Sequence, residues 1–452
     1  MGPVINPLYD SIAIENSAQM REAQRQVNEE MIRRDCLFDG KPLPHFLKPY
    51  FLSEKQTELL GDMSACLIGV LEKITKIYFE RPELQSKFGL SPLAAELMEI
   101  HPGYSRNIVI SRPDAFLDGE DLQFIEFNCD SPAGAVFTDL EEEIFLNAFP
   151  MTELGKQVDW VRFSRTEAVV DALLDCYMDF GGRREHPSIA IVDWRDVKTQ
   201  GEFKLLQNYL NQEGYEAVIA DPRDLVYKQG ELYAGGVRID LVYRRVIFNE
   251  LMESIYEVQD FIRAYRDKKV CVVNPLRSRL AANKAMLSLL TNNAYDHFFT
   301  DKENEAKKKY IAWTRRLVDA EHFYGGRKKL VIDLVLNHQE DMVLKPADGY
   351  GGKNVFIGRE TSKEEWRRLA EKALDAEEEW VVQEYVPIPE QTVPVIEGNA
   401  VKLVKKKVNI NPYVFNGRYA GAIARLSDDS VINVSAGGGL VPAITYAERE
   451  ET

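Results

Sequence analysis

The sequence has few of the features that mark secreted, zinc-binding or membrane proteins. Its five cysteines are widely separated, with no C-x-x-C pair, and its six histidines are scattered. Such cysteines indicate reduced thiols in a cytoplasmic protein, and the histidines give little support for a zinc site. No apolar run approaches the roughly 18 residues that span a bilayer, and the first residues, MGPVINPLYDS, lack the apolar core of a signal peptide. We therefore expect a cytoplasmic protein with no membrane partner.

The chain also has fewer basic than acidic residues. The 452 residues include 56 Lys and Arg against 72 Asp and Glu, a formal net charge of -16. A general surface for nucleic acid is therefore disfavoured, and an anionic ligand would need a local basic cleft. With 45% apolar and 28% charged residues, the chain has material for a large core in two or three structural units. We expect small-molecule partners, and the composition leaves the oligomeric state open.

A glycine-rich hairpin over residues 342–358, MVLKPADGYGGKNVFIG, is the most unusual local pattern that is present. Gly349, Gly351 and Gly352 lie between two apolar strand segments, and Lys345 lies in the leading strand. Glycine N–H groups can approach phosphate oxygens closely, and a lysine adds positive charge. The loop is neither a Walker A loop nor a dinucleotide fingerprint, because the spacing differs and no helix follows. The alternative is an ordinary flexible hairpin.

A second polar pattern lies on two upstream strands that a turn joins. Glu126 and Asn128 are two residues apart and share one face of the returning strand, whereas Ile125 should face the other side. Asp114 lies on the preceding strand. Two carboxylates and an amide oxygen that converge are hard ligands, which suit Mg2+. The alternative is a sheet with one wet face, where such residues would be ordinary.

The order of the elements predicts an α/β (α+β) protein with four regions. Residues 1–100 form an N-terminal helical region, in which Ser53-Glu54-Lys55-Gln56 is a capping box. Residues 101–150 carry the expected metal-binding strands. Residues 187–270 alternate strands and helix as a small doubly wound, Rossmann-like module, which lacks the G-x-G-x-x-G of a nicotinamide site. Residues 271–452 form the expected nucleotide-binding region.

Lys284, Lys345, the glycine hairpin and the strand WVVQEYV follow one another in an order that resembles the nucleotide half of the ATP-grasp superfamily. In that family two lysines and a glycine-rich hairpin hold the triphosphate, and the strand after the next helix contacts adenine through backbone groups, here those of Glu384 and Val386. The resemblance therefore implies a set of ATP-binding residues. The set is Lys284, Lys345, Gly349, Tyr350, Gly351, Gly352, Lys353, Gln383, Glu384, Tyr385 and Val386.

The expected metal motif lies upstream of these residues, and this order resembles the circularly permuted ATP-grasp proteins. Residues 112–116 resemble the R-x-D-F motif and residues 126–132 the E-Y-N-x-D-x-P motif of a relative, the synthetase domain of glutathionylspermidine synthetase. The resemblance covers roughly residues 108–442 and implies a circularly permuted ATP-grasp fold with the doubly wound module as its pre-ATP-grasp part. It also implies that Mg2+ is held by Asp114, Glu126 and Asn128, and that Arg112 and Arg425 are catalytic.

The activity that the resemblance implies is ATP-dependent joining of a carboxylate and an amine through an acyl phosphate, with release of ADP and phosphate. A kinase on the same fold and a non-catalytic nucleotide-binding protein stay open as alternatives. The segments on the substrate side do not match the relative, so the identity of the carboxylate and the amine does not follow. We expect the acceptor to bind near Arg112, Arg244, Arg245 and Arg425.

Overall fold

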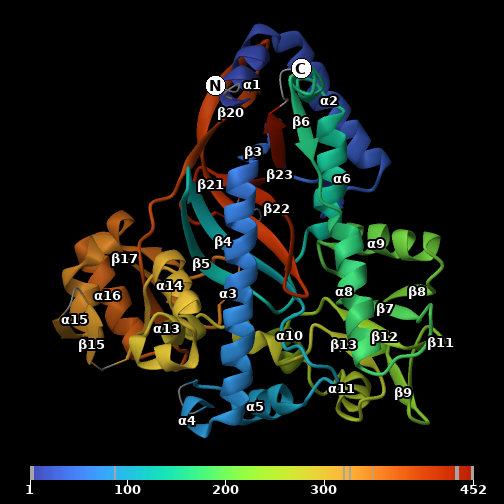
Figure 1. The fold of residues 1–452 in the computed structure, drawn as a ribbon, viewed down its shortest axis with the longest axis vertical. Helices are drawn as coiled ribbons and strands as arrows, with labels where there is room; N and C mark the ends of the chain where they lie inside the picture. Colours follow the sequence, from blue (N-terminus) through green and yellow to red (C-terminus); the bar gives the residue numbers. More distant parts are fainter. Residues whose placement is uncertain are drawn as a thin grey trace.

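The computed structural model describes residues 5–85, 88–318, 321–324, 327–349, 351–432 and 437–448. Its largest sheet has eight strands and joins segments from both ends of the chain (Figure 1). In spatial order these are β3 (Tyr50–Ser53), β23 (Gly439–Glu448), β22 (Arg418–Ser427), β21 (Ala400–Phe415), β4 (Ile110–Asp118) and β5 (Asp121–Asn128), with β20 (Glu390–Glu397) on β21 and β6 (Val158–Val161) on β23.

The 16-residue strand β21 holds this sheet together. Its first half pairs with β20, and its second half pairs with β4, where Ile410 lies opposite Ala115. β22 pairs with β21 along its other edge. The hairpin β4–β5, on which the sequence predicts the metal ligands, is therefore continuous with the C-terminal strands.

Three long helices cover this sheet. α3 (Glu54–Glu80) packs on β21 and β22, while α6 (Ala135–Leu146) and α8 (Arg165–Asp179) pack on β21, β22 and β23 (Figure 1). The Ser53 hydroxyl accepts the N–H of Gln56 at 3.2 Å and the Gln56 side chain accepts the N–H of Ser53 at 3.1 Å, so the predicted capping box is present. Gly61 allows α3 to approach closely, because a Cβ there would lie 3.1 Å from the ring of Tyr419.

The doubly wound module has a four-stranded parallel sheet. Three of its strands are buried, as expected for a parallel sheet covered on both faces, whereas the strand Ala217–Ala220 at one edge is half-buried. The fourth strand in chain order lies just past residue 270, where the sequence places the end of this module. The elements are β8 (Ala217–Ala220), β7 (Ile189–Val192), β12 (Leu241–Arg244) and β13 (Cys271–Val273), with α9 (Gln200–Gln212), η1 (Pro222–Asp224), the meander β9 (Val226–Lys228), β10 (Glu231–Ala234) and β11 (Val237–Ile239), α10 (Phe248–Glu253) and α11 (Gln259–Arg266).

A separate lobe, on the left in Figure 1, is built on a four-stranded antiparallel sheet. Val343 pairs with Ile357 across the glycine loop, so the predicted hairpin is present. The elements are β14 (Thr314–Arg316), β19 (Trp380–Glu384), β17 (Met342–Pro346) and β18 (Phe356–Ile357), the hairpin β15 (Glu321–Tyr324) and β16 (Arg327–Leu330), and α12 (Ser278–Ala282), α13 (Ala285–Leu290), η2 (Asn293–Phe298), α14 (Asp301–Tyr310), α15 (Val331–Asn337), η3 (Gln339–Asp341), η4 (Gly358–Glu360) and α16 (Lys363–Leu374).

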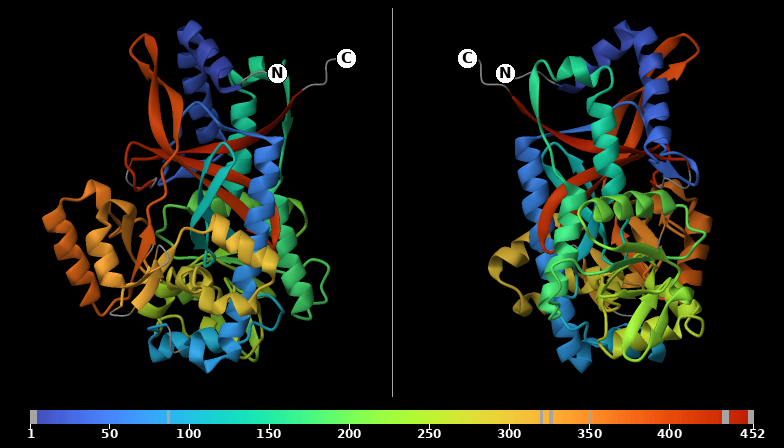
Figure 2. Two further views of the ribbon diagram at one scale, coloured as in Figure 1. Left: turned by 60° about the vertical axis from the view of Figure 1, so that its left-hand side comes forward. Right: turned by 90° about the vertical axis from the view of Figure 1, so that its right-hand side faces the viewer.

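The N-terminal helices lie beside the protruding β20–β21 hairpin at the top of Figure 2. Among the described residues, no helix is long and apolar enough to cross a membrane. The remaining elements are α1 (Ile5–Glu15), α2 (Ser17–Arg33), β1 (Leu37–Phe38), β2 (Lys41–Pro42), α4 (Pro82–Gln85), α5 (Pro92–Glu99) and α7 (Met151–Leu154).

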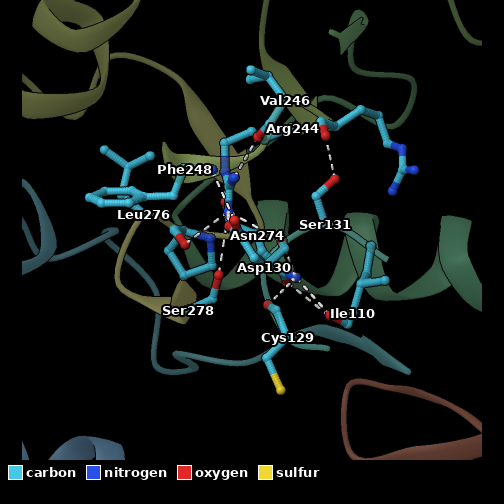
Figure 3. Close-up of polar contacts among 12 residues, drawn as sticks. Ile110, Cys129, Asp130, Ser131, Arg244, Val246, Phe248, Asn274, Leu276 and Ser278 are labelled. Atoms are coloured by element: carbon cyan, nitrogen blue, oxygen red, sulfur yellow. Dashed lines mark hydrogen bonds and ion pairs between the residues drawn. The ribbon is translucent and has the colours of Figure 1, made fainter. Parts of the chain in front are cut away.

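A buried polar network joins the doubly wound module to the end of β5 (Figure 3). The guanidinium of Arg244, which is 0% exposed, donates to Asp130 Oδ1 at 2.6 Å and to the carbonyl oxygens of Asn274 and Val246 at 2.9 and 2.7 Å. The second oxygen of Asp130 accepts the N–H of Phe248 at 2.9 Å. Each charge is therefore buried with its partner and with further hydrogen bonds, the condition under which a buried ion pair is tolerated.

Asn274, just after β13, extends the same network to both strands of the β4–β5 hairpin. Its Nδ2 donates to the carbonyl oxygens of Ile110 at 2.7 Å, Cys129 at 2.9 Å and Asp130 at 3.0 Å. Its Oδ1 accepts the N–H groups of Val109 and Ile110 at 3.1 and 2.8 Å. One side chain thus fixes where β4 begins and where β5 ends.

Replacing Asp130 by alanine should destabilise the protein strongly, because Arg244 would stay buried without its partner. We expect a loss of about 3–5 kcal/mol in the free energy of unfolding. The matched control is Glu120→Ala, which breaks a surface ion pair with Lys55. The side chains of Glu120 and Lys55 are 63% and 73% exposed, so little change in the free energy of unfolding is expected. Urea denaturation of both variants tests this, and equal midpoints would contradict it.

Candidate functional site

One cavity of about 340 Å³ lies between the eight-stranded sheet and the sheet of the separate lobe. Strands β4, β5, β21 and β22 line one side, and β17, β18, β19 and the glycine loop line the other. Of the ATP-binding, metal-binding and catalytic residues that the resemblance implies, Tyr350 lies outside the described residues. All the others line this cavity: Arg112, Asp114, Glu126, Asn128, Lys284, Lys345, Gly349, Gly351, Gly352, Lys353, Gln383, Glu384, Tyr385, Val386 and Arg425.

The three predicted metal ligands come together through the pairing of β4 and β5. Asp114 lies directly opposite Glu126, and Asn128 donates from Nδ2 to Asp114 Oδ1 at 3.0 Å. The register shifts between Asp114 and Ala115, which leaves Ile125 as the extra residue of a β-bulge. The prediction that Ile125 faces away is wrong, because the bulge breaks the alternation and Ile125 lines the cavity beside Glu126.

Two asparagines on β21 complete this group, and sequence reasoning missed both. Asn411 donates to Asp114 Oδ1 at 2.9 Å and accepts from Arg425 Nε at 2.9 Å. Asn409 accepts from Arg425 Nη2 at 2.9 Å, and Arg425 also forms an ion pair with Asp114. The alternation N-I-N in an apolar strand was the available signal, but only the pairing of β21 with β4 shows what it faces.

Lys284 reaches the cavity because the helix around it is broken. The structure has two short helices here, α12 and α13, with Asn283 and Lys284 between them. Asn283 Oδ1 accepts the N–H of Ala285 at 2.8 Å, and such a local bond competes with the helical pattern. The ammonium of Lys284, 5% exposed, donates to the carbonyl of Gly349 at 2.6 Å and lies 3.0 Å from Glu126 Oε1.

Lys345 is buried beside Gln383, and this pair links the two sheets. Lys345 Nζ donates to Gln383 Oε1 at 2.7 Å, and Gln383 Nε2 donates to Thr314 Oγ1 at 2.9 Å and to the carbonyl of Ile125 at 3.2 Å. Burial lowers the pKa of Lys345 to about 8, although the nearby Glu126 carboxylate acts in the opposite direction. The surroundings of Lys345 therefore disfavour the positive charge on its ammonium group.

Glu126 faces both lysines. Burial alone would raise the pKa of its carboxyl group, but the positive charges of Lys284 and Lys345 outweigh burial and hold the pKa below its usual value. The carboxylate is therefore ionised at neutral pH. With two cations and one carboxylate, this part of the cavity favours an additional anionic ligand.

The glycine loop is anchored by Asp348. Its carboxylate accepts from Arg279 at 2.7 Å and from Asn249 Nδ2 at 2.9 Å, so the loop is tied to α12 and α10. Beyond this anchor, Gly351 and Gly352 have φ of 69° and 72°, a conformation that side chains with a Cβ rarely adopt. The loop thus combines a fixed base with a glycine tip that lines the cavity.

This arrangement agrees with a comparison with known families. The family model for circularly permuted ATP-grasp type 2 proteins matches residues 128–427. The chain belongs to this family. The predicted family and the predicted ATP-grasp fold are therefore confirmed, although Arg112, Asp114 and Glu126 precede the matched region.

Individual relatives are distant. An uncharacterised protein of Mycobacterium leprae is 24% identical over 263 residues, 53% of this chain and 43% of that protein. A putative glutamate–cysteine ligase of Frankia casuarinae is 23% identical over 233 residues, 49% of this chain and 25% of that protein. The chain thus matches less than half the length of each. A glutathione synthetase-like effector of Globodera pallida superimposes with a TM-score of 0.63 at 12% identity, covering 93% of this chain and 96% of the effector, and this likeness shows the fold alone.

The expected adenine-binding strand of this ATP-grasp fold lies at the cavity edge. The N–H of Glu384 is donated to the carbonyl of Trp313 at 2.8 Å, and the N–H of Tyr385 to the carbonyl of Asp341 at 2.7 Å. Of the two backbone groups of Glu384, the carbonyl is therefore the one left to face a purine. The guanidinium of Arg359 packs 3.6 Å from the centre of the Tyr385 ring and supports this segment.

The two arginines predicted as catalytic differ in how much hydrogen-bonding capacity they have left. Arg425 is held by Asp114, Asn409 and Asn411. Arg112 donates from Nη1 to the carbonyl of Ala133 at 2.7 Å, while its buried Nε has no hydrogen-bond partner. These contacts favour a positioning role for Arg425, whereas Arg112 has fewer hydrogen bonds to the protein.

Two other arginines do not reach the cavity, so the expectation that they bind the acceptor is wrong. Arg244 is enclosed in the network around Asp130. Arg245 donates to the carbonyl of Pro132 at 2.6 Å and packs against the rings of Phe203 and Tyr243. Sequence alone could not separate these buried arginines from Arg112.

The oxygen atoms around Asp114 fit a hard cation such as the Mg2+ that the family implies. Within the described ranges, no three His, Cys, Asp or Glu side chains gather closely enough to hold a metal ion, so the set depends on an amide oxygen. Asn128 uses its amide nitrogen on Asp114, which leaves its oxygen for a cation. Glu126 meets Lys284 through Oε1 only, and Asp114 Oδ2 meets Arg425, so lone pairs remain on both carboxylates.

The low pKa of Lys345 predicts how stability depends on pH. The unfolded lysine keeps its proton to about pH 10.5, whereas the folded one releases it at about pH 8, so the unfolded state binds more protons between these values. The free energy of unfolding of the wild type should rise with pH in this window by about 3 kcal/mol relative to Lys345→Met. Chemical denaturation of both proteins from pH 7 to 10 measures the difference, and parallel curves would contradict it.

Proposed function

We propose that the protein is an ATP-dependent carboxylate–amine ligase that forms an amide or peptide-like bond through an acyl phosphate and releases ADP and phosphate. The observation that carries the proposal is one cavity with Lys284, Lys345 and the glycine loop on one side and Asp114, Glu126 and Asn128 on the other. The putative glutamate–cysteine ligase among the relatives supports a ligase of this kind. Its substrates are not carried over to this chain.

The nucleotide would lie across the separate lobe. Val343 and Ile357, adjacent on β17 and β18, offer an apolar surface to adenine, and the carbonyl of Glu384 and the N–H of Val386 offer edge contacts. Lys284 and Lys345 offset the charge of the α- and β-phosphates. The N–H groups of the glycine tip close over the phosphate chain, which places the γ-phosphate towards Glu126.

Asp114, Glu126 and Asn128 are the residues that would hold Mg2+, which supplies charge neutralisation between the β- and γ-phosphates when it is bound. Asn411 and Arg425 keep the Asp114 carboxylate in place through the contacts described above. Lys284 keeps Glu126 ionised and oriented. The protein's part in the phosphoryl transfer is therefore positioning and electrostatics more than acid–base chemistry.

The proposed reaction has two steps. A substrate carboxylate oxygen attacks the γ-phosphorus, the bond to ADP breaks, and an acyl phosphate forms. The amine nitrogen then attacks the carbonyl carbon, inorganic phosphate leaves, and the nitrogen loses a proton to solvent. Arg112 has donors available for the carboxylate and for the negative charge that develops on the carbonyl oxygen. Small-molecule substrates and a cytoplasmic location belong to the same proposal.

Glu126→Gln should weaken the Mg2+-dependent binding of a non-hydrolysable ATP analogue about 10- to 100-fold, because a neutral amide is a poorer ligand for a hard cation and a poorer partner for Lys284. Glu120→Gln, an exposed change on the same hairpin, should bind like the wild type. Calorimetric titration with and without Mg2+ gives the affinities. Unaltered binding by Glu126→Gln would remove the proposed metal site.

Arg112→Ala should keep the affinity for the Mg2+–nucleotide analogue and lose turnover about 100-fold or more, because its guanidinium faces the carboxylate and not the nucleotide. Turnover is measured as ADP release in the presence of hydroxylamine, which converts an acyl phosphate to a hydroxamate. ADP release that depends on a carboxylate but yields no hydroxamate would instead identify a kinase. Equal loss of nucleotide affinity and turnover would place Arg112 at the phosphates.

A further inference from the structure

Part of the cavity lining is marked by no sequence motif. It comes from three distant parts of the chain: Phe38 and Leu43 from the N-terminal region, Phe137 from α6, and Leu440 from β23. These four side chains are called the apolar wall. Thr199, just before α9, adds one hydroxyl group. None of these five side chains is charged.

The register of the large sheet places Leu440, one member of the apolar wall, on the far side of Arg425 from Asp114. Asn409 pairs with Arg425, and Arg425 pairs with Leu440 on the next strand. Leu440 on β23 is therefore three strand spacings, roughly 14 Å, from the strand that carries Asp114. A group bound beside Leu440 would therefore lie beyond Arg425, away from the proposed metal ligands.

Backbone contacts fix the N-terminal segment that carries Phe38 and Leu43, so this part of the apolar wall has a defined position. The N–H of Leu440 donates to the carbonyl of Pro44 at 2.7 Å, and the N–H of Asp39 donates to the carbonyl of Lys198 at 3.0 Å. Gly201 at the start of α9 allows a close approach, because a Cβ there would lie 2.5 Å from the carbonyl oxygen of Leu37. The segment 37–44 is thus held against both β23 and α9.

We propose that the carboxylate substrate carries an aliphatic or aromatic group, which the apolar wall receives while its carboxylate lies beside Arg112. This inference rests on the proposed ligase function. An apolar wall favours such a group by removing its surface from water, whereas a second carboxylate would be buried there without a cation. The wall therefore selects the carboxylate partner of the reaction, and Phe38 and Leu440 are its specificity-determining residues.

The test uses hydroxylamine as the amine, so that the natural amine is not needed. The substrate carboxylate takes the γ-phosphoryl group of Mg2+–ATP, ADP leaves, and hydroxylamine nitrogen displaces phosphate to give a hydroxamate. Two matched pairs of carboxylates serve as probes: 4-methylpentanoate with glutarate, and L-leucine with L-glutamate. In each pair the apolar member should give a kcat/KM at least about tenfold higher.

Phe38→Ala should then raise the KM for the apolar probes about tenfold and leave the affinity for the ATP analogue unchanged. The matched control is Leu37→Ala, because the neighbouring residue on the same strand faces the opposite side and lines a separate cavity. Retained affinity for the analogue in both variants shows that they are folded.

Three outcomes would overturn the inference. Higher kcat/KM with glutarate and L-glutamate would reject the apolar class while the ligase function stands, and so would an unchanged KM in Phe38→Ala. Carboxylate-dependent ADP release without any hydroxamate would reject the ligase function and the inference with it. The two failures are therefore distinguishable in the same assay.

Discussion

The pairing of β21 with β4 is the contact on which the candidate site depends. It joins strands from the two ends of the chain, so that Ile410 lies beside Ala115. As a result, Asn411 on β21 and Arg425 on β22 contact Asp114 on the β4–β5 hairpin. Without this register the Asp114 carboxylate would have none of its partners on β21 and β22. The circular permutation of the family is reflected in this pairing. The strands β4 and β5 of the site precede the separate lobe in sequence, and the strands β21 and β22 follow it.

The candidate site buries two lysine ammonium groups at a cost in stability that an anionic ligand would reduce. Lys345 is buried strongly enough to lower its pKa, Lys284 is almost fully enclosed, and only Glu126 faces both. A surplus of buried positive charge costs folding stability, and an anionic ligand such as the proposed triphosphate would offset that cost. The protein has a net charge of -16, so most of its surface repels anions. An anionic ligand would therefore collect at this local group of positive charges and not elsewhere.

How much of this could be predicted from sequence depends on the range of the interactions. The glycine hairpin and the capping box of α3 are local patterns, and each is present where the sequence indicates it. The bulge at Ile125, the contacts of Asn409 and Asn411, and the exclusion of Arg244 from the cavity are set by partners far away in the chain. No local pattern specifies them. The roles of the site residues and the domain boundaries stay predictions.

The same distinction explains why the nucleotide side of the cavity is easier to interpret than the substrate side. A triphosphate needs lysines and glycines at recurring spacings, which leave a motif in the sequence. An apolar wall needs only side chains of suitable size, and segments 37–44, 135–146 and 439–448 can each supply one without any motif. The contacts of Arg425 with Asp114 turn it towards the β4–β5 hairpin, while Arg112 is the arginine that the proposal assigns to the substrate. Under the proposed function, substrate choice would therefore depend on packing between distant segments, and it could change while the ATP site stays the same.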